Sequence, residues 1–483
     1  MTNLYEPTWS SLRSHSTPQW FRDAKFGIYT HWGVYSVPAY GPNATWYPYN
    51  MYREGTAQYD YHLKTYGGPK KFGYKDFIPR FTGEKFDPDE WAELFKRAGA
   101  KFAGPVAEHH DGFSMWDTSY TKWNSVNMGP KRNVVGELEK AIRQQDMKFM
   151  TAFHHAENWW FFPHWRKDFD TADPSYADLY GPPHDLDYPD TNTVSDVWTA
   201  FRQQTKPDTA FLDVWKGKMV EVVEKYRPDL IWFDFGLDFV HEQYKQDFLA
   251  YYYNKAREWD HGVVVTYKWN HLPPGTAVID LELGKMSEQT YFEWITDTTV
   301  DDGEGWGYLK DTTYKPSSEL VHYLIDNVSK NGYMLLNVGP KPNGEIPDEA
   351  KVSLDGIGKW LEVNGEAIYG TVPWVLYGEG PTKMTTDGAF SDTREKLRYT
   401  SQDIRFTVKD NVLYAICLNW PGEELTIESL TRLYPGEINS VQMLGVDHEL
   451  QWRMTDAGLV IERPEERPCD SAYTFKIIRN KSL

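Results

Sequence analysis

Short apolar runs alternate with helix-like segments along the first 370 residues of this chain. The apolar runs predict strands at residues 25–31, 101–107, 148–153, 230–233, 263–269, 277–282 and 333–339. Apolar positions at helical spacing, bounded by capping residues, predict helices at 87–99, 134–145, 213–227, 244–259, 319–329 and 349–363. This alternation is typical of βαβ units. Because no glycine-rich phosphate loop follows the first strand, the pattern favours an α/β fold of the (β/α)8-like (TIM) barrel type over a doubly wound sheet.

The pattern changes after about residue 371. Helical periodicity fades, and short runs with period two appear at 404–408 and 413–418, separated by turn residues. We therefore expect a catalytic barrel over residues 1–370 and a small antiparallel β-sandwich over residues 371–483. We expect this second region to support the barrel and to contribute little to chemistry.

Several predicted barrel strands end in polar residues. Catalytic groups of such barrels lie at the C-terminal ends of the strands. The strand ends supply His31, His109, His110, His154, His155, Asp234, Lys268 and Glu282. Asp234 is the most informative of them, because it directly follows the apolar run 230–233. The alternatives are that a strand-end Asp only caps a turn and that the histidines are structural.

Charge and composition limit the classes of binding partner that this chain is expected to have. The chain has 70 Asp and Glu against 51 Lys and Arg, a net charge of −19, which argues against nucleic acid or an anionic membrane surface. It has two cysteines and lacks an apolar run long enough to span a membrane. Its first residues lack the features of a signal peptide, so we expect a cytoplasmic protein, or a periplasmic or secreted one whose leader has been removed.

Carboxylates, imidazoles and aromatic rings at one face suit glycoside hydrolysis. A retaining glycosidase needs two carboxyl groups about 5–5.5 Å apart, and sugars pack on aromatic faces. The chain contains 21 Trp, 32 Tyr and 24 Phe, although many of these rings belong to the core. A metal site is the competing interpretation of the histidines. Because adjacent strand residues face opposite sides and no chelating motif is present, we expect neither metal nor cofactor.

Long motifs of the chain resemble glycoside hydrolase family 29, the α-L-fucosidases. The matching segments, in family order, are 20–33, 108–113 with Trp116-Asp117, 128–132, 335–340, 364–370 and 403–407. The resemblance covers nearly the whole chain. It implies a retaining, exo-acting enzyme that removes terminal α-L-fucosyl residues from fucosylated oligo- or polysaccharides.

The resemblance also assigns residues. Asp234 falls on the family's nucleophile. The expected sugar-binding residues are His31, Trp46, His109, His110, His154, Trp232, Lys268 and Trp294. The chain departs from the family pattern at Thr45, where Glu is common, at Phe153, where a pocket Tyr is usual, at His155, which replaces a small residue, and at Lys268, where Arg is frequent.

The acid/base is the least determined position. We expect Glu282, because it ends the apolar-rich run 277–281 and would reach the catalytic face. Glu293 is the runner-up, since it stands one residue before Trp294; the following position, often Glu in the family, is Ile295 here. Glu288 and Glu304 lie in polar segments and are weaker candidates.

Two alternatives to a strict fucosidase stay open. An enzyme of this type could also accept α-L-galactosides, because an apolar pocket discriminates an added hydroxyl only modestly. A fucose-binding protein of the same fold without catalysis is the second, and the intact carboxylates argue against it.

Overall fold

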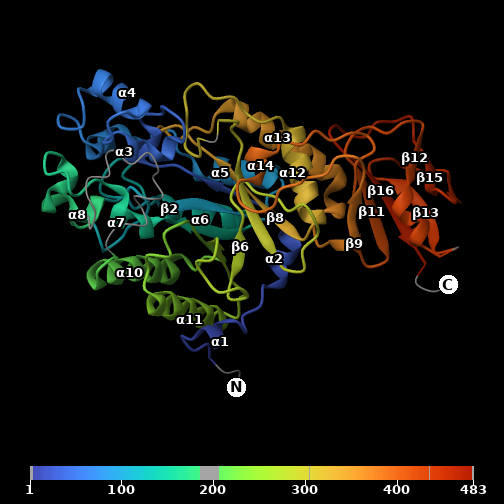
Figure 1. The fold of residues 1–483 in the computed structure, drawn as a ribbon, viewed down its shortest axis with the longest axis horizontal. Helices are drawn as coiled ribbons and strands as arrows, with labels where there is room; N and C mark the ends of the chain where they lie inside the picture. Colours follow the sequence, from blue (N-terminus) through green and yellow to red (C-terminus); the bar gives the residue numbers. More distant parts are fainter. Residues whose placement is uncertain (1–3, 185–205, 304, 435, 481–483) are drawn as a thin grey trace.

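A closed barrel of eight parallel strands forms the larger part of the molecule (Figure 1). The computed structural model describes residues 4–184, 206–303, 305–434 and 436–480. The strands are β1 (Phe26–Thr30), β2 (Phe102–Glu108), β3 (Lys148–Phe153), β4 (Leu230–Phe233), β5 (Val264–Lys268), β6 (Val278–Asp280), β7 (Trp294–Thr299) and β8 (Gly332–Val338). They follow one another in chain order, and β8 pairs with β1 to close the barrel. The TIM-type barrel expected from the sequence is confirmed.

The helices that follow the strands match the predicted segments within a few residues. They are α5 (Pro88–Arg97), α6 (Val134–Gln144), α10 (Thr209–Tyr226), α11 (Glu242–Glu258), α12 (Ser317–Ser329) and α13 (Asp348–Asn364). Shorter helices are α1 (Trp9–Leu12), α2 (Gln19–Ala24), α3 (Tyr47–Asn50), α4 (Ala57–Tyr66), α7 (Asn158–Phe161), α8 (Ala177–Tyr180) and α14 (Ser391–Arg394). None of the described helices is both long and apolar enough to cross a bilayer.

Helix α5 shows how local sequence sets these boundaries. The Asp87 side chain accepts hydrogen bonds from the backbone N–H groups of Asp89 and Glu90, and Pro88 occupies the first turn. Trp91 and Phe95 are buried against the barrel. The capping residues and the apolar face therefore both predict a helix over these residues.

Strand β7 is the barrel strand that the apolar pattern did not predict. Four of its six residues from Trp294 to Thr299 are polar, yet every residue in it is buried. Its polar groups find partners inside the protein: Thr296 donates to the Leu281 carbonyl, and Asp297 receives a hydrogen bond from Lys268. Tertiary contacts thus stabilise this strand, although its polar sequence does not show the apolar pattern of a buried strand.

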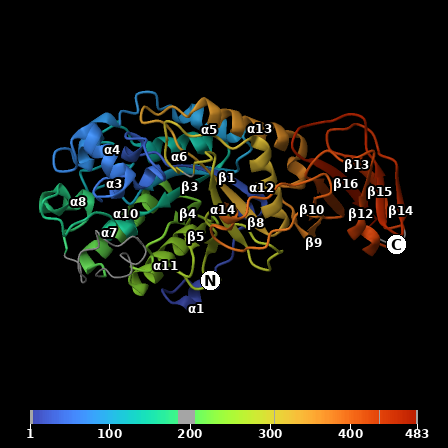
Figure 2. The same ribbon diagram turned by 45° about the horizontal axis from the view of Figure 1, so that its top comes forward.

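Residues after β8 and α13 form two antiparallel sheets (red in Figure 2). The first sheet has the order β13-β16-β11-β10-β9 and the second β12-β15-β14. Their bounds are β9 (Val372–Glu379), β10 (Ile404–Lys409), β11 (Val412–Cys417), β12 (Glu424–Ile427), β13 (Ile438–Met443), β14 (Trp452–Thr455), β15 (Gly458–Glu462) and β16 (Tyr473–Arg479). Both sheets contribute to one apolar cluster that includes Phe406, Leu459 and Phe475. The expected β-sandwich is confirmed.

The β-sandwich is joined to the barrel by buried contacts. Arg405 of β10 donates to Asp326 of α12 over 2.6 Å, and Lys330 lies 2.8 Å from the same carboxylate. Trp360 of α13 donates to the Ala472 carbonyl. Phe390 of the C-terminal region also reaches the catalytic end of the barrel.

Candidate active site

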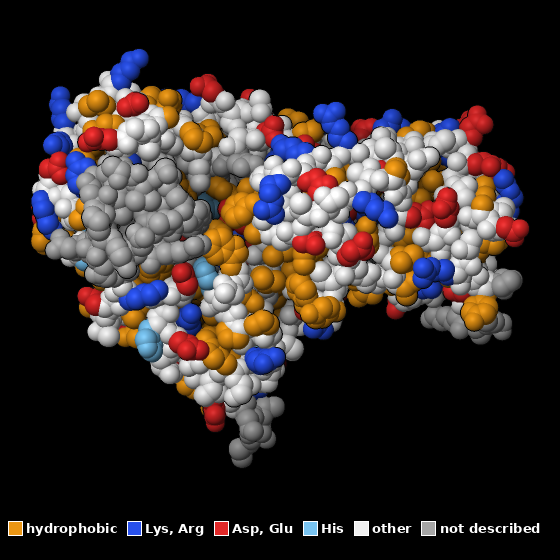
Figure 3. Space-filling model, in the orientation of Figure 1, with side chains coloured by type: hydrophobic (Ala, Val, Ile, Leu, Met, Phe, Trp, Pro, Cys, Tyr) orange, Lys and Arg blue, Asp and Glu red, His pale blue; other side chains and the backbone are white. Residues whose placement is uncertain are grey.

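A cavity of about 470 Å³ opens at the C-terminal ends of the barrel strands. Figure 3 shows a hollow near the middle of this face with hydrophobic side chains along its rim. The lining residues are Tyr29, His31, Pro42, Asn43, Thr45, Trp46, Tyr49, Asn50, Arg53, Gln58, His109, His110, His154, Trp232, Asp234, Phe235, Glu282, Asp297, Trp306 and Phe390. Parallel strands bring these distant residues together, as the barrel rule requires.

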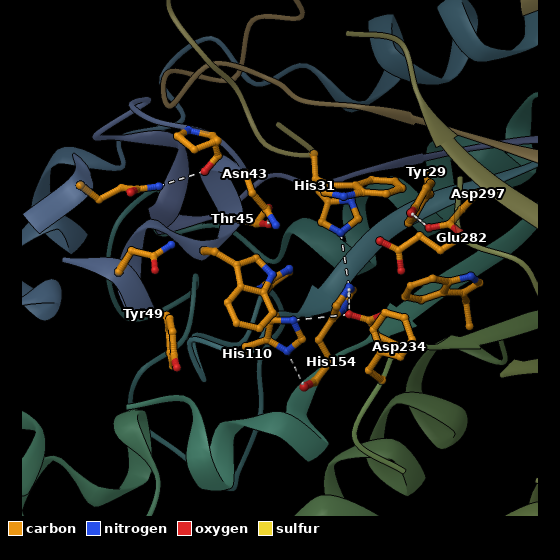
Figure 4. A pocket seen from close by; sticks show the side chains of 18 of the residues that line it. Tyr29, His31, Asn43, Thr45, Tyr49, His110, His154, Asp234, Glu282 and Asp297 are labelled. Carbon is orange, nitrogen blue, oxygen red and sulfur yellow. Dashed lines mark hydrogen bonds and ion pairs between the residues drawn. The ribbon is translucent and has the colours of Figure 1, made fainter. Parts of the chain in front are cut away.

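Asp234 lines this cavity and directly follows β4. Its backbone N–H donates to the Phe153 carbonyl, so the position of the residue is fixed by the end of β3. The Nε2 atoms of His110 and His154 each lie 3.4 Å from Oδ2 of Asp234 (Figure 4). Burial raises the pKa of Asp234 to about 6, with His110 opposing the shift. The carboxylate is therefore ionised at neutral pH.

Asn337 of β8 fixes the orientation of His31. The amide nitrogen of Asn337 donates to the Trp306 carbonyl over 2.6 Å, which leaves its oxygen facing His31. That oxygen lies 2.8 Å from Nδ1 of His31 and accepts its proton. Because the ring is neutral, Nε2 of His31 is left as an acceptor, 3.3 Å from Nε2 of His154.

The pocket histidines are neutral imidazoles. Burial lowers the pKa of His31 to about 4, and it lowers the pKa of His109 and His154 well below 6.5. A neutral imidazole offers one donor and one acceptor, which is what a sugar hydroxyl needs.

The same residues also define where a metal could bind. Among the described residues, two groups offer ligand atoms within 4.8 Å of one another: His31 with His109 and His154, and His110 with Glu157 and Asp234. The absence of a metal from the chemistry stays a prediction.

Two tryptophans shape the walls of the pocket. The ring of Trp46 lies edge-on to the His110 ring at a centroid distance of 5.5 Å. Trp232 donates from its indole nitrogen to Asp280 over 2.7 Å. Its ring also lies 4.7 Å from the ammonium of Lys268. The indole of Trp232 is therefore held by two contacts, and both tryptophans line the cavity as expected.

Lys268 lies behind the pocket wall, within a group of carboxylates. Its Nζ atom is 2.7 Å from Asp297, 3.0 Å from Asp280 and 3.3 Å from Glu282. Tyr29 donates to the other oxygen of Asp297. These contacts occupy the three donors of the ammonium, and Lys268 does not line the cavity, which corrects its expected position against the sugar.

Glu282 faces the same cavity as Asp234 (Figure 4). Its side chain retains 13% exposure. Burial raises the pKa of Glu282 to about 8, although Lys268 opposes the shift. At neutral pH Glu282 is therefore mostly protonated, whereas Asp234 is ionised. One pocket thus holds a carboxylate and a carboxylic acid.

Glu293 and Trp294 lie at the opposite end of the barrel, and this corrects two expectations. They stand at the N-terminal end of β7. Glu293 pairs with Arg22 over 3.1 Å and accepts a hydrogen bond from Tyr333. The indole nitrogen of Trp294 donates to the Lys330 carbonyl. A strand has one catalytic end, so neither residue can take part in the pocket.

The remaining departures and candidates have clear positions. Phe153 faces away from the cavity and contacts Trp116, so the missing tyrosine there removes no group from the pocket. His155 also faces outward, paired with Glu108. Glu288 is exposed. Glu304 lies outside the described residues.

The sequence did not single out five of the residues that build the site. They are Tyr29, Asp297, Trp306, Asn337 and Phe390. Asn337 carried a usable signal, because it stands near the end of a predicted strand. Asp297 was missed because its strand, β7, was not predicted. Phe390 was missed because it belongs to the C-terminal region.

Comparison with known proteins decides the family. The family model described as alpha-L-fucosidase matches residues 1–366, and the model of the alpha-L-fucosidase C-terminal domain matches residues 396–478. The chain belongs to the alpha-L-fucosidase family.

Relatives of this family match along nearly the whole chain. The tissue alpha-L-fucosidase of Rattus norvegicus is 31% identical over 98% of this chain and 93% of its own length. The human tissue enzyme is also 31% identical, over 98% and 91% of the two chains. The crystal structure of Thermotoga maritima alpha-fucosidase with a mechanism-based inhibitor is 31% identical, covers 98% of this chain and 100% of its own, and has a TM-score of 0.77. The structure of that fucosidase with fucose has a TM-score of 0.76.

Proposed function

We propose that this chain is a retaining exo-α-L-fucosidase in which Asp234 is the nucleophile and Glu282 the acid/base. The observation that carries the proposal is that Asp234, after β4, and Glu282, after β6, line one cavity in different surroundings. Burial raises the pKa of Glu282 to about 8 but that of Asp234 only to about 6. A retaining glycosidase needs this division of roles.

The proposed reaction has two displacements. In the first, the Asp234 carboxylate attacks C1 of the fucosyl unit, the glycosidic C–O bond breaks, and Glu282 gives its proton to the departing oxygen. In the second, the Glu282 carboxylate takes a proton from water, the water oxygen bonds to C1, and the bond to Asp234 breaks. Two inversions leave the configuration of C1 retained.

The neutral histidines hold the sugar in this proposal. His31, His109, His110 and His154 line the cavity together with Trp46. Burial keeps the imidazoles uncharged, so they hydrogen-bond ring hydroxyls without repelling the oxocarbenium-like transition state. The substrate is therefore a fucosylated oligo- or polysaccharide whose terminal unit enters the pocket. The catalytic unit comprises residues 1–370, with 371–483 as the C-terminal domain.

The test is removal of the nucleophile. Asp234→Asn should lower kcat by several orders of magnitude without lowering the melting temperature. Azide should partly rescue Asp234→Gly and give a fucosyl azide of inverted configuration. Glu293→Gln is the matched control, because it alters a carboxylate at the other end of the barrel and should retain activity. Near-normal turnover by Asp234→Asn would refute the mechanism. A fucose-binding protein would bind fucosides without turnover even when unaltered.

A further inference from the structure

A long connection of the C-terminal region crosses back to the catalytic barrel. It joins β9 to β10, which pair at Glu379 and Ile404, so residues 380–403 leave the sheet and return to the same place. Hydrogen bonds join the two ends of this connection: the carboxylate of Asp403 accepts from the backbone N–H and from the hydroxyl of Thr382. Figures 1 and 2 place α14, within this connection, beside α12 and β8. Connections of this length in a compact protein usually serve a function.

Residues 387–392 pack along the segment that follows β6. Three backbone hydrogen bonds join the two segments: Phe390 N–H to Glu282 O at 2.6 Å, Asp392 N–H to Leu283 O at 3.0 Å and Gly388 N–H to Lys285 O at 2.9 Å. The buried ammonium of Lys285 also lies 2.6 Å from Asp392. The Ser391 hydroxyl accepts a hydrogen bond from the backbone N–H of Lys285. The two segments are therefore firmly tied.

Glu282 depends on this contact because its strand is short. β6 ends at Asp280, two residues before Glu282. The β7 strand supports the flanking residues, since Leu281 N–H donates to the Ile295 carbonyl and Leu283 N–H to that of Asp297. The carbonyl of Glu282 receives its hydrogen bond from Phe390 instead.

Phe390 is held in an unfavourable backbone conformation. Its φ is 60°, in the left-handed region that bulky residues rarely adopt, and Leu283 opposite it has a φ of 45°. Such strain persists where the surrounding structure fixes it, and it is frequent at functional sites. The Phe390 side chain packs against the apolar cluster that contains Trp306 and Leu283, and it lines the pocket together with Glu282.

We propose that residues 387–392 complete the active site from the C-terminal region. Their backbone positions Glu282, and the Phe390 ring forms an apolar wall that keeps water from its carboxyl group. An apolar surrounding favours the neutral acid, which is the form that must donate the proton. Phe390 is thus a positioning residue, and the inference rests on the proposed role of Glu282.

The test compares aryl α-L-fucosides with good and poor leaving groups. For Phe390→Ala we expect kcat/KM to fall about tenfold or more with the poorest leaving group, and less than about threefold with the best. The basic limb of the pH profile should move to lower pH, because water now reaches Glu282. Phe390→Leu keeps an apolar wall and should restore most of the activity. Tyr434→Ala, an exposed aromatic of the same region, is the control.

A double-mutant cycle separates a positioning role from a structural one. When Glu282→Ala is already present, adding Phe390→Ala should lower kcat/KM by less than about twofold, because the group through which Phe390 acts is gone. A full further loss there, an equal loss with all leaving groups, or no loss at all would overturn the inference. If Glu282→Ala itself shows no graded loss, the acid/base assignment fails and the inference falls with it. A graded loss in Glu282→Ala but none in Phe390→Ala overturns the inference alone.

Discussion

At the scale of single residues, the site is defined by two carboxyl groups that differ in their surroundings. Asp234 has two imidazoles near Oδ2, whereas Glu282 has one lysine that it shares with two other carboxylates. Burial raises the pKa of both groups, and it does so more strongly for Glu282. One acid and one base thus coexist at neutral pH.

These protonation states predict a bell-shaped pH profile of kcat/KM. Activity needs ionised Asp234, whose pKa is raised by burial to about 6, so it should fall as pH drops through that value. It also needs protonated Glu282, whose pKa is raised by burial to about 8, so it should fall as pH rises through that value. The two limbs report the coupled pair. Glu282→Gln should lose the basic limb; a basic limb that is unchanged in this variant would contradict the assignment.

The acid/base role of Glu282 predicts a graded loss among leaving groups. Glu282→Ala should slow aryl fucosides with poor leaving groups by about 10²-fold or more, and those with good leaving groups far less, because only the former need a proton. Initial rates over a series of phenols measure this. Glu293→Ala is the control, since its carboxylate lies at the other end of the barrel beside Arg22. A graded loss in Glu293→Ala instead would move the role there.

At the scale of elements, a buried ion pair ties α10 to the end of β2. Lys218 lies 2.8 Å from Glu108, which also contacts His155 and Ser114. Burial alone would raise the pKa of Glu108, but Lys218 and His155 lower it to about 2. Because Glu108 directly precedes His109 and His110, this pair fixes the segment that carries two pocket histidines.

Loss of that pair should destabilise the protein strongly. Lys218→Met leaves the buried Glu108 carboxylate without its only lysine partner, with His155 and Ser114 as its remaining contacts. Removing one partner of a buried ion pair costs about 3–5 kcal/mol of unfolding free energy. The folded pKa of Glu108 lies below its usual value, so its stabilisation is present above about pH 4.5 and is lost as pH falls toward about 2. Denaturant melts at pH 7 and pH 3 measure both effects. Lys225→Met, a partly exposed lysine of the same helix, should change stability little.

At the scale of the whole molecule, the sandwich and the barrel share buried charge. Arg405 of β10 and Lys330 both contact Asp326 of α12. Tyr414 and Ile416 of the sandwich belong to the same apolar cluster as the barrel core. These contacts couple the two regions, and residues 387–392 extend the coupling to the catalytic end.

This coupling predicts a single unfolding transition that depends on Arg405. Arg405→Ala should lower the midpoint of that transition by several degrees, because it removes one partner of a buried charge network at a cost of about 3–5 kcal/mol. Calorimetry measures it. Arg453→Ala is the matched control, since Arg453 pairs with Glu424 at the surface and should shift the midpoint little. Two separate transitions in the unaltered protein would contradict the coupling.

The sequence by itself determined the barrel, the sandwich and the position of Asp234. Apolar runs that end in polar residues are enough for this, because both faces of a barrel strand are buried and its C-terminal end is the catalytic end. The same rule supplied His31, His109, His110 and His154 as candidates, and all four line the pocket. The expectation that adjacent residues face opposite sides was wrong for His109 and His110, because β2 ends at Glu108 and both histidines follow the strand.

Only the tertiary structure decided the rest of the site. β7 carries Asp297, and its polar residues become acceptable in the core through partners such as Lys268. Glu282 and Glu293 are close in the chain, but one lies beyond the end of β6 and the other before the start of β7, at opposite ends of the barrel. Phe390 reaches Glu282 across more than a hundred residues. Such contacts depend on how the barrel closes and how the sandwich packs on it, and the pKa values follow from the resulting burial, which a linear pattern does not contain.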